Sequence, residues 1–190
     1  VMKILVMGYS GAGKSTVAQI LGRKHRCPVL HLDTVQFREN WQEREAGEAE
    51  KLAEEFLENR SWVIDGNYMG RFSFARRGRE GDWIILLLLP RHICLYRALK
   101  RYWQNRGRVR DSMAAGCEEK MDWEFIRWIL WEGRRKEYRN GFRRLAEENC
   151  RKTLVCTSAR RAAAVADCLF LEEKGKAPVD NSDNSRYNAT

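Results

Sequence analysis

The residues with the clearest chemical meaning lie near the start of the chain. The segment 8–16 reads Gly-Tyr-Ser-Gly-Ala-Gly-Lys-Ser-Thr. It follows an apolar run and precedes a helical repeat, which is where the pattern G-x-x-x-x-G-K-[ST] marks a phosphate-binding loop. Glycines let such a loop turn its N–H groups toward an anion, and the helix adds its positive end. The alternative is a glycine-rich turn that binds nothing. The predicted nucleotide-binding residues are Gly8, Ser10, Gly11, Ala12, Gly13, Lys14, Ser15 and Thr16.

Three residues predict ATP and Mg²⁺ as cofactors. Lys14 is expected to reach the β- and γ-phosphates as a catalytic cation, and the Ser15 hydroxyl to ligate Mg²⁺. Asp65 ends the mostly apolar run 61–65. That position is typical of the carboxylate that holds a water on Mg²⁺, a pattern that gains weight beside the loop. Gly66 follows it and indicates that something, such as the acceptor, approaches the backbone closely. Asp65 and Gly66 are therefore also expected to bind the acceptor.

The expected acceptor site lies at the ends of the next strands. Asp33 closes the expected strand 29–33, and ligands of open α/β sheets bind beyond such strand ends. It is expected to orient or deprotonate an acceptor hydroxyl; the alternatives are a helix N-cap and a solvated loop aspartate. Arg38 and Arg71 would bind a phosphate on the acceptor. Arg71 opens a loop-like segment that is more typical, as a group, of a solvated surface. The remaining arginines of this segment are Arg76, Arg77 and Arg79.

Arginines farther along the chain are candidates for binding the transferred phosphate. Arg97 and Arg101 are four residues apart in the expected helix 91–104, so they share one side, Arg97 for the nucleotide and Arg101 for catalysis. The segment 105–120 is expected to be a lid whose Arg106 and Arg110 close over the phosphates. A basic surface loop and a nucleic-acid contact remain alternatives. One long helix is expected over 121–148, from which Arg134 or Arg135 could reach the phosphoryl group.

Strands and helices alternate along the chain, which predicts an α/β fold with a parallel sheet covered on both faces. We expect one domain over 1–173, with an acceptor flap at about 34–59 and the lid at about 105–120. A disordered tail is expected over 174–190. The five expected strands are 3–7, 29–33, 61–65, 82–89 and 152–157.

Composition limits the other function classes. The formal net charge of +9 fits either a nucleic-acid surface or a site for a polyanionic nucleotide. Six cysteines without a C-x-x-C pair argue against zinc and against a disulfide framework, and indicate thiols in a reducing cytoplasm. No apolar run has the length of a membrane span, and no signal peptide is expected before the first strand. We expect a cytoplasmic monomer or homodimer with ATP and a small acceptor as partners.

Several segments together resemble a known family. They are 8–16, Leu-His-Leu-Asp-Thr-Val-Gln-Phe at 30–37, Trp-Val-Ile-Asp-Gly-Asn-Tyr at 62–68, Arg-Tyr-Trp at 101–103 and Gly-Cys-Glu-Glu-Lys at 116–120. From about 2 to 171 the chain resembles the bacterial DNA topology modulation protein family, in the adenylate-kinase-like branch of P-loop kinases. The resemblance implies a P-loop NTPase fold with strand order 2-3-1-4-5, and paired arginines at Arg97 and Arg101 that meet ATP. Asn67-Tyr68 replaces the Phe-Pro of adenylate kinases.

Three functions follow, in order of preference. The first is transfer of the ATP γ-phosphoryl to a nucleoside, a nucleotide or a similar small molecule. The second is a nucleic-acid-associated ATPase or regulator that affects DNA topology, which predicts a steep loss of DNA affinity with salt. The third is a nucleotide-binding protein with no acceptor, which predicts thermal stabilisation by nucleotide without transfer.

Overall fold

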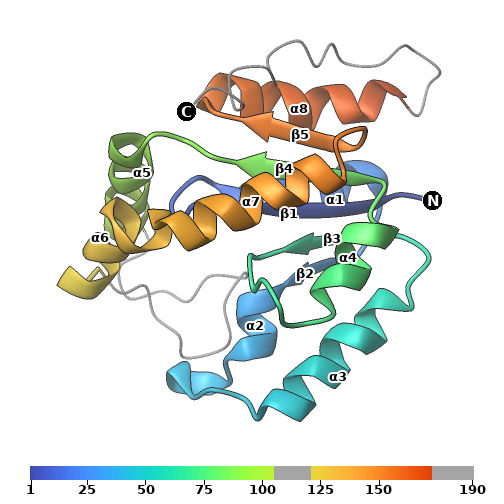
Figure 1. Cartoon of the computed structure of the whole chain (residues 1–190), viewed down its shortest axis with the longest axis horizontal. Helices are drawn as coiled ribbons and strands as arrows, with labels where there is room; N and C mark the ends of the chain where they lie inside the picture. Colours follow the sequence, from blue (N-terminus) through green and yellow to red (C-terminus); the bar gives the residue numbers. More distant parts are fainter. Residues whose placement is uncertain (105–120, 173–190) are drawn as a thin grey trace.

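One parallel sheet forms the centre of the molecule (Figure 1). The computed structural model describes residues 1–104 and 121–172. Within them, five strands pair in the order β2-β3-β1-β4-β5. The expected α/β fold and strand order are therefore confirmed. The strands are β1 (Lys3–Gly8), β2 (Val29–His31), β3 (Trp62–Asp65), β4 (Trp83–Leu87) and β5 (Thr153–Cys156).

The central strand β1 leads directly into the glycine-rich segment. Its residues from Ile4 to Met7 are fully buried, as expected for a strand covered on both faces of a parallel sheet. Parallel pairing sets Gly8 beside Leu87 of β4 and Val6 beside Asp65 of β3. The carboxyl ends of the three middle strands therefore meet at the start of the loop.

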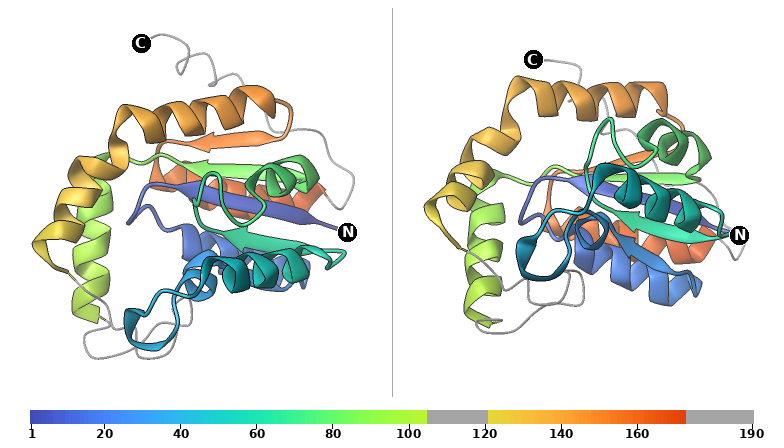
Figure 2. Two further views of the ribbon diagram at one scale, coloured as in Figure 1. Left: turned by 60° about the horizontal axis from the view of Figure 1, so that its bottom comes forward. Right: turned by 90° about the horizontal axis from the view of Figure 1, so that it is seen from below.

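Helices cover both faces of this sheet. Figure 2 shows α4 and α7 over one face and α1 and α8 over the other. Helices α5 and α6 stand beyond the carboxyl ends of the strands (Figure 1). The bounds are α1 (Lys14–His25), α2 (Leu32–Gln36), η1 (Glu39–Trp41), α3 (Ala46–Leu57), α4 (Phe74–Glu80), α5 (Arg91–Gln104), α6 (Trp123–Leu130), η2 (Glu132–Arg134), α7 (Lys136–Glu148) and α8 (Ala159–Glu172).

The structure corrects two local predictions. The second strand ends at His31 rather than at Asp33, which instead lies in the first turn of α2. The arginine-rich segment after residue 71 contains α4, and the prediction of a solvated surface is wrong for Arg77, whose exposed fraction is 0%. Its guanidinium donates to the carbonyl oxygens of Phe72, Tyr68 and Arg71, at 2.7, 3.2 and 3.0 Å. It stays buried because these backbone acceptors surround it.

The prediction of a single helix over 121–148 is also wrong. The chain forms α6, a short 3₁₀ turn and α7, and the break falls at Trp131, which has φ −132° and ψ −60°. The Arg134 side chain stabilises the break, because its Nε donates to the Ile129 carbonyl at 3.0 Å near the end of α6. The aromatic side chains of this region therefore belong to two helices, with Trp131 in the break between them.

The expected lid at 105–120 and the expected tail at 174–190 lie outside the described residues. The segment expected as the acceptor flap holds most of α2 together with η1 and α3. The cysteines that the structure describes are free thiols: Cys27, Cys94, Cys150 and Cys156. Among the described helices, none is long and apolar enough to cross a membrane.

Candidate active site

The glycine-rich segment forms a tight loop between β1 and α1. The Ala12 amide donates to the Tyr9 carbonyl at 3.1 Å, which closes the turn, and α1 begins at Lys14. Gly11 has φ +78°, and a Cβ at this position would lie 2.3 Å from the Cys94 carbonyl oxygen. The backbone of α5 thus approaches the loop so closely that only glycine fits there.

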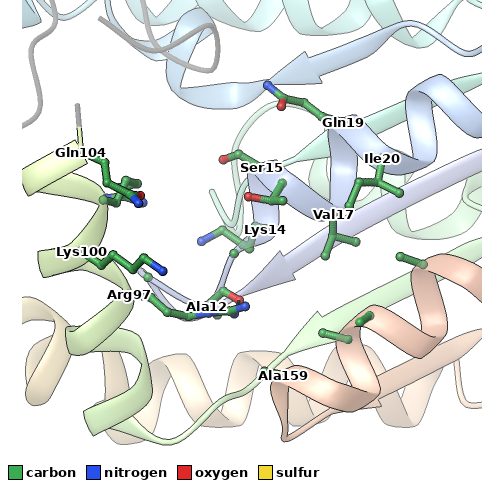
Figure 3. Close-up of a pocket in the computed structure, with 17 residues that line it drawn as sticks. Ala12, Lys14, Ser15, Val17, Gln19, Ile20, Arg97, Lys100, Gln104 and Ala159 are labelled. Carbon is green, nitrogen blue, oxygen red and sulfur yellow. Dashed lines mark hydrogen bonds between the residues drawn. The ribbon is translucent and has the colours of Figure 1, made fainter. Parts of the chain in front are cut away.

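A large cavity opens in front of this loop. Its volume is about 780 Å³, within the range of small-molecule sites. It lies between the loop, α1, α5 and α8, and Figure 3 shows Lys14 and Lys100 extending into the same space from α1 and α5. Among the described residues that line it, none is acidic and four are cationic. The cationic residues are Lys14, Arg97, Lys100 and Arg101. A polyanion fits such a cavity.

Arg97 is the arginine of the expected pair that contacts the loop. Its Nη1 donates to the Ala12 carbonyl at 2.7 Å, so α5 holds the loop from the side opposite α1. Arg101 lines the same cavity one turn farther along α5. The other two arginines expected to be catalytic, Arg106 and Arg110, lie outside the described residues.

Within the loop, the residues of the motif face different partners. Gly8 ends β1, the loop contains Ser10, Gly11, Ala12 and Gly13, and the first turn of α1 contains Ser15 and Thr16. The Lys14 Nζ donates to the Tyr9 carbonyl at 3.3 Å, a long hydrogen bond that a phosphate oxygen could replace. The Ser10 hydroxyl accepts from Trp128 Nε1 at 3.1 Å. The segment α6–α7 therefore supports the outer side of the loop.

Arg134 belongs to this outer support and not to the cavity in front of the loop. Its Nη2 donates to the Leu89 carbonyl at 2.9 Å, and its Cζ lies 3.8 Å from the centre of the Tyr9 ring. Arg135 is exposed and lies 4.0 Å from Glu132. Neither residue lines the nucleotide cavity, so the structure does not support the expectation that one of them reaches the phosphoryl group.

Asp65 is buried beside the start of the loop, with an exposed fraction of 5%. Its Oδ2 lies 2.9 Å from His31 Nδ1, its neighbour in the sheet register. Its Oδ1 has no hydrogen-bond partner in the part of the chain that the structure describes. A buried carboxylate oxygen without a partner requires one, and a metal-bound water would satisfy it. The residues present therefore fit a magnesium ion.

The residues expected to bind the acceptor, Asp33, Arg38 and Arg71, each contact another side chain of the fold. Asp33 is exposed on α2, and its Oδ1 accepts from the Tyr68 hydroxyl at 2.7 Å. Burial, followed by the charge of Asp33, raises the pKa of Tyr68, so the phenol keeps its proton and remains the donor. Arg38 is paired with Glu48, and the Arg71 guanidinium lies 5.0 Å from the Phe72 ring centre. Both arginines would have to change partners to bind an acceptor phosphate.

Gly66 has a structural neighbour where an acceptor contact was expected. With φ +140°, a Cβ on this residue would lie 2.8 Å from the Leu32 Cβ. Packing of α2 on the end of β3 thus accounts for the glycine. Three contacts that the sequence did not reveal are those of Asn67 with the Gly8 backbone, of His31 with Asp65, and of Trp128 with Ser10. Asn67 lies two residues after Asp65, and His31 lies two residues before Asp33. Their partners lie 59 and 34 residues away in the sequence, so no local pattern identifies these contacts.

The strand order 2-3-1-4-5 and the glycine-rich loop between β1 and α1 together define a P-loop NTPase fold of the adenylate-kinase-like type. Comparison with protein-family models and with curated proteins found no match. Solved structures do resemble the chain. A shikimate kinase from Acinetobacter baumannii in complex with shikimate has a TM-score of 0.53 and 17% identity, over 93% of this chain and 97% of that one. An uncharacterized protein from Eubacterium ventriosum has a TM-score of 0.51 and 12% identity, over 93% and 100%. These likenesses support the fold.

Proposed function

We propose that the protein is a phosphotransferase that moves the γ-phosphoryl group of ATP to a small-molecule acceptor. The observation that carries the proposal is the cavity in front of the loop, which holds four cationic side chains and no acidic one among the described residues. Backbone amides, a helix N-terminus and fixed cations stabilise the charge that develops in phosphoryl transfer, which is most of what this reaction requires.

Each side chain of the nucleotide site has a proposed role. Lys14 leaves the Tyr9 carbonyl and contacts the β- and γ-phosphates. Arg97 keeps the loop in place through Ala12, while Arg101 lies where it can neutralise charge on the phosphates. Ser15, with Asp65 through a water, would hold Mg²⁺, which supplies charge neutralisation between the β- and γ-phosphates. His31 fixes the orientation of the Asp65 carboxylate.

We propose that Asp33 accepts the proton of an acceptor hydroxyl as the phosphoryl group is transferred. The Tyr68 hydroxyl holds one oxygen of Asp33, and this leaves the other oxygen for the acceptor. The segment 34–59 would cover the acceptor as a flap, and Arg71 would meet an acceptor that carries a phosphate. Alcohols therefore form the first acceptor class, with shikimate among them because a kinase of that name has a similar fold.

The test is a panel of nucleosides, nucleotides and small alcohols incubated with γ-labelled ATP and Mg²⁺. We expect one class to yield a labelled product. The Asp33→Asn variant should keep nucleotide affinity and lose transfer, whereas Lys14→Ala should lose both. If no compound is labelled while ATP still binds, the protein is a nucleotide-binding protein without an acceptor. If Asp33→Asn transfers at the wild-type rate, Asp33 is not the base.

A nucleic-acid-associated ATPase, the activity that the resemblance to DNA topology modulation proteins suggests, is the second candidate. It rests on the net charge of +9. Four arginines are already engaged within the fold, because Arg44 and Arg76 form ion pairs, and Arg77 and Arg134 bind backbone carbonyls. DNA affinity measured against salt distinguishes the candidates, since several phosphate contacts require a steep fall in affinity.

A further inference from the structure

A second cavity is lined by Tyr9 of the phosphate-binding loop, by residues that follow β4 and β5, and by residues at the junction of α6 and α7. Figure 1 shows that this junction lies near the ends of β4 and β5. Its volume is about 480 Å³, which also falls in the range of small-molecule sites. It shares no lining residue with the nucleotide cavity, and Tyr9 is the loop residue that faces it. The two cavities are therefore separate candidate sites that lie on different sides of one loop.

Three arginines surround this second cavity, and no acidic residue lines it among the residues that the structure describes. Arg134 is fixed, since its Nε and Nη2 bind the Ile129 and Leu89 carbonyls and its flat face lies on the Tyr9 ring. Arg91 and Arg139 are exposed, and neither has an ion pair within the described ranges. Glu132, in the adjoining turn, is paired with Arg127 at 2.7 Å. The cavity therefore presents uncompensated positive charge.

Apart from the three arginines, Tyr9 and Thr157, the lining is apolar. Leu88, Leu89 and Pro90 come from the segment after β4, Leu130 ends α6, and Trp131 stands in the break between α6 and α7. The Trp131 side chain is 53% exposed, although indole rings usually find apolar cover. A flat, exposed ring beside guanidinium groups is suited to stacking on a planar ligand whose anionic group is held by arginine.

We propose that this cavity binds a small organic anion, a phosphate monoester or carboxylate carried on a planar apolar body. Arg91 and Arg139 hold the anionic group, and Trp131 with the leucines contacts the planar body. Arginine forks match the two oxygens of a carboxylate or phosphate, which explains the preference for these anions. The ligand is distinct from the nucleotide, because the phosphate-binding loop presents only Tyr9 to it.

The test uses 4-fluorophenyl phosphate as the probe and its ¹⁹F NMR signal as the readout. All proteins carry Lys14→Ala, so that binding of the probe at the phosphate-binding loop is weak and is the same in every variant compared. We expect a Kd tighter than about 1 mM in this background. Arg139→Gln should weaken binding about tenfold or more, as loss of a charged hydrogen bond does, and Trp131→Ala should also weaken it. Arg144→Gln, on the exposed side of the same helix, is the matched control and should change nothing.

Two further probes separate the parts of the ligand. 4-Fluorophenol lacks the anion and 4-fluorobenzoate replaces the phosphate by a carboxylate; we expect no binding of the first, and the affinity of the second identifies the preferred anion within the proposed class. Thermal unfolding of each variant checks that it is folded. The proposal is overturned if the probe does not bind, if 4-fluorophenol binds as tightly, or if Arg139→Gln and Trp131→Ala behave like Arg144→Gln.

Discussion

The Asn67 side chain forms two hydrogen bonds with the backbone of Gly8. Its Oδ1 accepts from the Gly8 amide at 2.9 Å and its Nδ2 donates to the Gly8 carbonyl at 3.0 Å. These bonds join the end of β3 to the start of the phosphate-binding loop, where β1 would otherwise leave both backbone groups without a partner. The residue that follows the Asp65–Gly66 pair therefore anchors the loop.

Replacement of Asn67 by alanine tests this anchor. Asn67→Ala leaves a buried amide and carbonyl unpaired, and we expect the free energy of unfolding to fall by about 2 kcal/mol. Nucleotide affinity should fall as well, because the loop loses its fixed start. Asn59→Ala, which removes one exposed bond to the Phe56 carbonyl, is the control and should cost less than about 1 kcal/mol. Equal losses in urea denaturation for both variants would contradict the anchor.

Arg97 is expected to act on nucleotide binding through the loop. In Arg97→Gln the Ala12 carbonyl loses its charged donor and the cavity loses one cation. We expect a Kd for ATP about tenfold weaker, with little change in stability. His92→Gln on the exposed side of α5 is the matched control. An unchanged Kd in Arg97→Gln, measured by calorimetry, would remove Arg97 from the nucleotide site.

Arg77 is expected to stabilise the fold, without a direct role in the chemistry. Burial lowers the pKa of Arg77 to about 10, so the guanidinium is still charged at neutral pH, and three carbonyl acceptors satisfy its donors in the core. Arg77→Ala should lower the free energy of unfolding by about 3 kcal/mol or more, because these acceptors lose their donor. Arg79→Ala, on the exposed side of the same helix, should stay within about 0.5 kcal/mol of wild type. Similar denaturation midpoints for the two variants would refute the assignment.

Cysteine reactivity tests the packing at the end of the sheet. Burial raises the pKa of the Cys156 thiol to about 11, so at pH 8 it is almost entirely protonated and shielded. Cys150 is exposed and should react with iodoacetamide in the native protein. Mass spectrometry of peptides should find Cys150 modified and Cys156 unmodified until urea is added. Early modification of Cys156 would show that β5 opens locally.

Much of the fold could be predicted because its signals are local. The loop motif, the apolar strands and their alternation with helices all lie within short stretches, and the structure places them as expected. The sequence predicts a strand up to Asp33, whereas the structure has a helix from Leu32. Strand and helix signals overlap at Leu32, and its packing against Gly66 favours the helix. The break between α6 and α7 could not be predicted, because it involves Arg134, whose contact with the Leu89 carbonyl spans 45 residues.

The candidate site was predictable only in part for the same reason. Its motif residues are consecutive, so the sequence identifies them. Asn67 and Trp128 reach the loop across 59 and 118 residues, and no periodicity reveals such contacts. Arginine also has no fixed place in the fold: Arg97 contacts the loop, Arg77 is in the core and Arg38 pairs with Glu48. Composition alone could not separate these uses of positive charge.

The most direct measurement is calorimetric titration with a non-hydrolysable ATP analogue and Mg²⁺, for the wild type and for Lys14→Ala. Both proteins should unfold at similar temperatures, because the only partner of Lys14 Nζ within the described residues is the Tyr9 carbonyl. We predict that the wild type binds with a Kd below about 1 mM and that Lys14→Ala binds about a hundredfold more weakly. A folded wild type that takes up no analogue, or a variant that binds equally well, would contradict the phosphate-binding role of the loop.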